Sequence, residues 1–154
     1  MISLTESEYQ KRLRGQKKAP KTAKVKEESS MAIAKTKKGI VELTLPWPPS
    51  VNLAYRTWNN KLVKTKVASA YFNQESLLIR SKGIQSFGES RIKVEVKCYP
   101  PDKKRRDLDN LGKVLIDTLE NSGLFKNDSQ IDDLHFIREC VKSPGFVVVR
   151  IEEV

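Results

Sequence analysis

The sequence predicts an α+β protein, a single compact domain in which a mixed β-sheet is packed by two main helices. Four short stretches alternate apolar and polar residues, as strands do, and two longer stretches repeat apolar residues at helical period. Along the chain these elements follow the order β-α-β-α-β-β, which is typical of this fold class. The chain has 154 residues and 38% hydrophobic content, enough to enclose one core and hardly two.

The first half of the predicted domain contains one strand and one helix. In residues 40–45, IVELTL, apolar and polar side chains alternate, which predicts a half-buried strand that PWPPSVN ends. Residues 66–82 place their apolar side chains on one helical face, and Gly83 supplies a stop. The members of that face are Val67, Ala70, Tyr71, Gln74, Leu77 and Leu78.

The second half repeats the pattern and ends in two strands. RIKVEVKCY (91–99) alternates, and after the loop PPDKKRR a stripe at helical period predicts a helix. This helix should begin near Asp109, whose side chain is expected to cap it, and end at a left-handed Gly123. LHFIRECV (134–141) and FVVVRIEE (146–153) indicate two strands joined by the turn SPG, and an extra short strand near 124–131 is an alternative. The stripe consists of Leu108, Leu111, Val114, Leu115, Thr118 and Leu119.

Charge divides the chain into an arm and a domain. The net charge of +10 and pI of about 9.6 favour a polyanionic partner, either nucleic acid or an anionic membrane surface. Residues 1–38 hold 11 Lys/Arg and 4 Glu, net +7, whereas residues 39–154 hold 18 basic and 15 acidic residues, net +3. Few large apolar residues occur before residue 39, so we expect a basic arm that is disordered or partly helical, followed by the folded domain 39–154.

Several protein classes are disfavoured by what the sequence contains. It shows neither the apolar region of a signal peptide nor the ~18 consecutive apolar residues that span a bilayer, so we expect a soluble, cytoplasmic protein without a membrane partner. Cys98 and Cys140 form no CxxC motif, and His135 is the one histidine. A zinc site, a disulfide or a Ser-His-Asp arrangement is therefore not indicated, and both cysteines are expected to be buried free thiols.

The remaining candidates for catalytic or metal-binding residues are carboxylates. Asp107 and Asp109, here called the aspartate pair, flank Leu108 where a loop enters a helix, so both are placed to offer oxygen atoms to one hard cation such as Mg²⁺. Lys113 follows Asp109 by four residues, on the same helical face. The preceding KKRR run suits the phosphates of a nucleic acid.

Chain geometry suggests a third acid. The helix from Asn110 to Ser122 carries the chain roughly 18 Å away from the aspartate pair at about 1.5 Å per residue. An extended return from Gly123 covers roughly 17 Å in the five steps to Asp128, at about 3.3 Å per residue. If the return is extended, Asp128 comes to lie beside the aspartate pair.

The run RRDLDNLGKVLIDTLENSGLFKNDSQID (105–132) resembles the signature of the RusA family of Holliday junction resolvases, D-x-D-N-x-x-K, a helix and a (D/N)-D-x-Q turn. PPSVN (48–52) resembles a short element near the family's amino terminus. The resemblance implies a RusA-like fold, with Asp107, Asp109 and Asp128 as metal-binding catalytic acids and Lys113 as the essential lysine. Asn127 and Gly112 depart from the family, which often has an acid and commonly a leucine at these two places.

The resemblance also implies cofactor and partners. It implies Mg²⁺, for which Mn²⁺ can substitute, and a homodimer that resolves four-way DNA junctions by paired symmetric nicks in recombination and repair. A two-fold symmetric dimer suits this task because the two nicks lie on strands related by near two-fold symmetry. Candidate DNA-binding residues are Asn52, Arg56, Lys103, Lys104, Arg105 and Arg106.

A second hypothesis is a non-catalytic accessory protein that binds branched DNA. The carboxylates separate the two hypotheses, because three acids against a DNA-binding surface would repel phosphate unless a metal ion intervened. Taken alone, an aspartate at a helix start is usually a cap. Trp47 and Trp58 also have two readings, stacking on unpaired bases or packing against the sheet.

Overall fold

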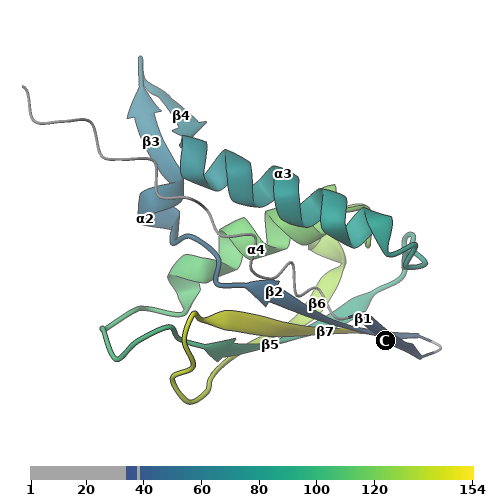
Figure 1. The fold of residues 1–154 in the computed structure, drawn as a ribbon. Coiled ribbons are helices and arrows are strands. Elements are labelled where there is room, and N and C mark those ends of the chain that lie inside the picture. Colours follow the sequence, from purple (N-terminus) through teal and green to yellow (C-terminus); the bar gives the residue numbers. More distant parts are fainter. Residues whose placement is uncertain (1–33, 38) are drawn as a thin grey trace, which may run out of the picture.

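The computed structural model describes residues 34–37 and 39–154. A five-stranded mixed sheet is covered on one face by two long helices, and a separate two-stranded hairpin extends from one end (Figure 1). The predicted α+β fold, with a mixed sheet packed by two main helices, is confirmed.

The sheet has the strand order β1-β2-β7-β5-β6. Its strands are β1 (Ala34–Lys37), β2 (Ile40–Pro46), β5 (Ile92–Tyr99), β6 (Ile131–Arg138) and β7 (Phe146–Glu153). β5 and β6 run parallel, and the other neighbouring pairs are antiparallel. The turn after β6 therefore does not make a hairpin, because β7 pairs with β5 and β2.

The remaining elements are helical or belong to the hairpin. The helices are α2 (Val51–Ala54), α3 (Lys66–Ser81), α4 (Asp109–Asn121) and the 3₁₀ turn η1 (Asp128–Gln130). The hairpin consists of β3 (Tyr55–Trp58) and β4 (Lys61–Lys64). α4 crosses from the end of β5 to the start of β6, which is the connection that a parallel strand pair requires.

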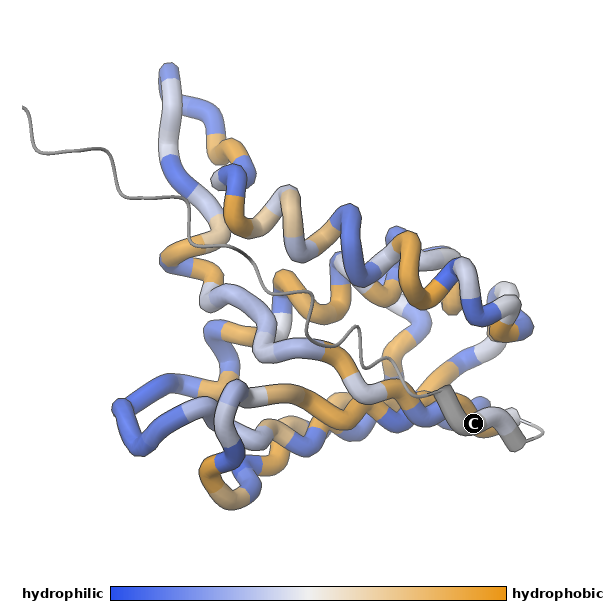
Figure 2. Tube along the Cα trace, viewed as in Figure 1, coloured by the Kyte–Doolittle hydropathy of each residue, from blue (hydrophilic) through white to orange (hydrophobic). Residues whose placement is uncertain are grey.

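The core lies between the sheet and the two long helices. Alternating residues of β2, β5 and β7 point toward the helices, and the predicted stripe of α4 faces them, with Leu115 and Leu119 fully buried. Burying one leucine contributes about 1.5–3 kcal/mol. Figure 2 shows the contrast with the loop between β5 and α4, which is continuously hydrophilic over its central part.

The buried face of α3 differs from the predicted one. Val67 and Leu77 are 64% and 63% exposed, and the residues that turn inward include Glu75, Ser76 and Ile79. Two members of the predicted face, Tyr71 and Leu78, do pack inward, and polar contacts accompany this apolar packing. The Ser76 hydroxyl donates to the carbonyl oxygen of Thr118 at 3.1 Å, and the Tyr71 hydroxyl donates to that of Pro46 at 3.0 Å.

Two segment predictions are corrected. Residues 34–37, assigned to the basic arm, form β1 and pair with β2; residues 1–33 and 38 lie outside the described residues. Residues 124–131 contain no separate strand: a turn and η1 precede β6, which takes in Ile131. Gln130 closes this turn, since its side chain accepts hydrogen bonds from the backbone N–H groups of residues 126 and 127.

The two cysteines are free, but only one is buried. Cys98 lies on the inner face of β5, where burial raises the pKa of its thiol to about 11. Cys140 is exposed, because β6 ends at Arg138, earlier than predicted. In the described part of the chain, no helix is long and apolar enough to cross a membrane.

Candidate functional site

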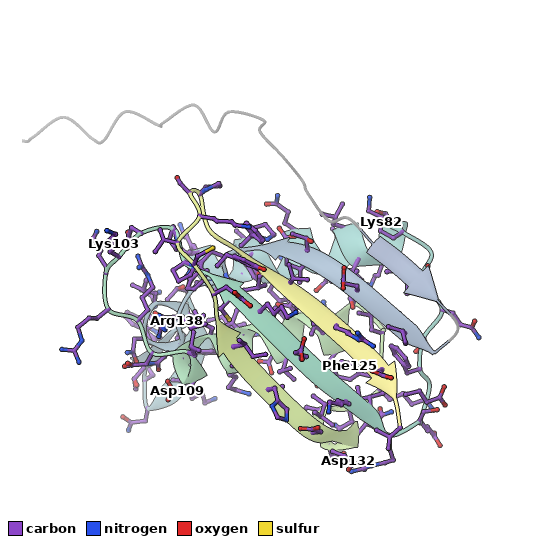
Figure 3. The ribbon with its side chains drawn as sticks, turned by 90° about the horizontal axis from the view of Figure 1, so that it is seen from below. Lys82, Lys103, Asp109, Phe125, Asp132 and Arg138 are labelled. Atoms are coloured by element: carbon purple, nitrogen blue, oxygen red, sulfur yellow. The ribbon has the colours of Figure 1, made fainter. Side chains whose placement is uncertain are left out.

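One end of the sheet gathers most of the predicted site residues. The loop after β5, the start of α4 and the end of β6 meet there, where the Arg138 guanidinium donates to the carbonyl oxygen of Arg106. Figure 3 shows Lys103, Asp109 and Arg138 together at this end and Asp132 at the opposite end. The KKRR loop and the aspartate pair are therefore presented on one side of the molecule.

A pocket lies between the PPSVN segment and the run that contains the basic loop and the aspartate pair. It has a volume of about 390 Å³ and is lined by Asn52, Arg105, Arg106 and Asp107 among others. Ala54 of α2 packs with Ala68 of α3 and Val114 of α4, which holds α2 beside the start of α4. Trp47 lines the pocket and also packs against the core, so the packing interpretation holds for this tryptophan.

The aspartate pair lies exposed where the loop after β5 enters α4. Asp109 is the first residue of α4, and Leu108 occupies the cap position without a side-chain cap, so the predicted capping role of Asp109 is wrong. Both carboxylates are exposed, and within the described residues no hydrogen bond or ion pair engages either one. Mg²⁺ is commonly held by one or two carboxylates together with substrate phosphates, so these donors fit it.

Asp128 lies at the other end of the sheet. It opens η1 directly before β6, and β6 starts beside Ile92 at the beginning of the parallel strand β5. The aspartate pair follows the end of β5, so within one protomer the length of α4 separates it from Asp128. The predicted extended return is wrong, because β6 itself runs back along the sheet. Among the described residues no three His, Cys, Asp or Glu side chains are close enough to share a metal ion.

Lys113 is held by an acid that the sequence interpretation missed. Its ammonium lies 3.3 Å from Oδ1 of Asp117, four residues further along α4. Oδ2 of Asp117 accepts a hydrogen bond from the Tyr55 hydroxyl at 3.0 Å. Burial, with the hydrogen bond and charge of Asp117, raises the pKa of Tyr55 to about 12, so this hydroxyl stays a donor at neutral pH. The i,i+4 spacing could have revealed Asp117, whereas Tyr55 is 62 residues distant.

Asp102 orders the KKRR loop. Its carboxylate accepts two hydrogen bonds from the Arg106 guanidinium, at 2.5 and 3.0 Å, and one from the backbone N–H of Lys104 at 2.8 Å. The Arg106 contact, followed by the Lys104 amide, lowers the pKa of Asp102 to about 2. Because the folded pKa lies below the usual value of about 3.9, the contact is fully present above pH 4 and is lost as pH falls through about 2.

For the nuclease that the sequence resemblance implies, we expect Asp102→Ala to slow phosphodiester cleavage about 3- to 10-fold without weakening DNA binding. A freed Arg106 holds the DNA backbone less precisely at the pocket, which slows cleavage. Its ordering cost on binding is offset by the loss of a negative charge that repels phosphate. Cleavage rates and DNA affinity measured between pH 6 and 8 would separate the two effects. Glu89→Ala is the control, since Glu89 is also paired with a cation, Lys126, far from the pocket. Equal cleavage by Asp102→Ala and wild type would show that the loop needs no such support.

Comparison with known proteins gives one consistent family. The family model described as "Endodeoxyribonuclease RusA" matches residues 46–152. The crossover junction endodeoxyribonuclease RusA of Escherichia coli K12 is 32% identical over 111 residues, covering 72% of this chain and 92% of that protein. Its namesake from Enterobacteria phage HK97 is 36% identical over 104 residues, covering 68% and 86%. The resemblance found in the sequence is confirmed.

Proposed function

Because the chain belongs to the RusA family of endodeoxyribonucleases, we propose that it is a Mg²⁺-dependent, structure-selective endodeoxyribonuclease that resolves four-way DNA junctions by paired symmetric nicks, in recombination and repair. The observation that carries the proposal is the meeting of the basic loop, the pocket and two unengaged carboxylates at one end of the sheet. A basic surface alone would be enough to bind DNA. Carboxylates within that surface would repel phosphate unless they held a cation.

Each part of the site has a chemical role in this proposal. Arg105, Arg106 and Asn52 bind the DNA backbone at the pocket. Asp107 and Asp109 would hold Mg²⁺, which when bound supplies an activated water and offsets charge on the leaving oxygen. Lys113 would stabilise the negative charge that develops on the phosphoryl oxygens. Asp117 and Tyr55 position that lysine through the contacts described above.

The separation of Asp128 from the aspartate pair bears on the proposed homodimer. If Asp128 is a third catalytic acid, as the family signature implies, a second copy of the chain must supply it. In a two-fold symmetric pair each copy would give its Asp128 to the other, so that both sites are completed together. This arrangement would also make cleavage depend on assembly, which protects DNA from a single protomer.

The proposed function is tested with a labelled four-way junction. We expect paired symmetric nicks with Mg²⁺ or Mn²⁺, and binding without cleavage in EDTA, because the metal acts in the chemical step. A duplex of the same sequence serves as the control substrate and should remain uncut. Junction binding without cleavage at any concentration of either metal would favour the non-catalytic accessory protein instead.

A further inference from the structure

The hairpin β3–β4 extends from the body beside α2 (Figure 1), and Asn52 and Leu53 of α2 line the pocket. Asn59 and Asn60 form its two-residue turn with φ angles of 48° and 58°, the left-handed pair typical of a tight I′ hairpin. Residues 55–64 carry three cations, Arg56, Lys61 and Lys64, and no acid. The hairpin is thus a narrow, positively charged ribbon.

Two large apolar side chains are exposed on this ribbon. Trp58 is 63% and Leu62 is 68% exposed, and the Arg56 guanidinium lies 5.8 Å from the centre of the Trp58 ring. In the cross-strand register Trp58 faces Lys61 and Leu62 faces Thr57, so the two apolar residues are on opposite faces. An uncovered tryptophan flanked by cations suits a nucleic-acid base, which offers a π face beside phosphate.

The base of the hairpin is fixed to the helices that carry the site. Tyr55 donates to Asp117 of α4, and the Lys64 ammonium lies 3.6 Å from the centre of the Phe72 ring on α3. The Thr65 hydroxyl donates to the carbonyl oxygen of Leu53 at 2.8 Å. Leu53 itself lines the pocket. The direction of the ribbon relative to the aspartate pair is therefore set before DNA binds.

We propose that this hairpin probes the branch point of the junction, with Trp58 stacking on a base exposed at its open centre and Arg56 and Lys61 contacting the flanking phosphates. In a continuous duplex each base is stacked on both sides and has no free face for an indole ring. At the centre of an open four-way junction, the innermost base pairs each have one free face. Stacking of Trp58 therefore favours the junction over the duplex, which deepens and rests on the proposed function.

The test compares junction and duplex affinities of full-length variants, with EDTA present to prevent cleavage. Trp58→Ala should weaken junction binding roughly 5- to 100-fold, the effect of losing one stacked base, with little change in duplex binding. Trp58→Phe should restore most of the preference. Leu77→Ala is the matched control, because Leu77 is equally exposed on α3. Circular dichroism would confirm that each variant is folded.

Two outcomes would overturn the inference: an unchanged junction affinity in Trp58→Ala, or equal losses for junction and duplex. A base analogue, 2-aminopurine, placed at the branch point gives an independent readout, since wild type should change its fluorescence and Trp58→Ala should not. Wild-type cleavage measured alongside keeps the two proposals apart. Metal-dependent cleavage with an unchanged preference in Trp58→Ala would defeat this inference alone; a Trp58-dependent preference without any cleavage would defeat the nuclease proposal alone.

Discussion

Asp109→Asn is expected to lower junction cleavage about 10²- to 10³-fold while junction binding stays equal or becomes tighter. The amide keeps the size of the side chain but removes the charge that would hold the metal, and a bound metal contributes several kcal/mol to the transition state. Binding should not suffer, because an exposed negative charge is removed from a surface that faces phosphate. Single-turnover cleavage in Mg²⁺ and affinity in EDTA measure the two quantities separately.

Glu42→Gln provides the control for this experiment. It makes the same change from carboxylate to amide at a partly exposed acid, but Glu42 lies on the outer face of β2, three strands away from β6 in the sheet. We expect it to cleave at close to the wild-type rate. Wild-type cleavage by Asp109→Asn would remove Asp109 from the mechanism, whereas a fall in both binding and cleavage would point to a folding defect.

Mixing two inactive variants, Asp109→Asn and Asp128→Asn, is expected to restore cleavage. If each site combines the aspartate pair of one copy with Asp128 of the other, a mixed dimer has one site with both substitutions and one intact site. Random mixing makes half of the dimers mixed, so the total nicking rate should reach roughly a quarter of the wild-type value. Because each mixed dimer has one working site, it should produce single nicks, which junction mapping distinguishes from paired cuts.

The other outcomes of mixing are equally informative. A mixture that stays inactive would mean that Asp128 acts within its own protomer, against the placement of η1 at the far end of β5 and β6. Full activity of Asp128→Asn alone would mean that Asp128 is not a catalytic acid. The control mixture, Asp107→Asn with Asp109→Asn, should remain inactive, since both substitutions fall in the same half of the shared site.

The sequence predicted the elements whose patterning is strong. The apolar stripe of α4, the strand alternation of β2, β5 and β7, and the left-handed Gly123, with φ +85°, agree with the structure because burial and local sterics decide each of them. The path after α4 could not be predicted in the same way. Leu124 and Phe125 are buried, so the chain turns into the core there, and no backbone spacing indicates how tertiary packing bends a segment.

Sequence reasoning identified the candidate site residues that are close together in the chain. The aspartate pair and the basic loop occur together in one run, and the PPSVN segment was matched to it only through the family resemblance. Asp102 was missed because its partner Arg106 lies in a loop, where a spacing of four residues carries no geometric meaning. The hairpin was missed because its strands are short, although Asn59 and Asn60 are a turn signal.

Gly112 lies where α4 packs closely against the edge strand β6 of the sheet. An added Cβ atom at this position would lie 3.4 Å from Cζ of Phe136 on β6, so alanine fits with little adjustment and a leucine does not fit unless the phenyl ring moves. Side chains at positions 112 and 136 therefore compete for the same space between α4 and β6. A bulky residue at position 112 requires the Phe136 ring to move or to be replaced by a smaller side chain, so the two positions constrain each other.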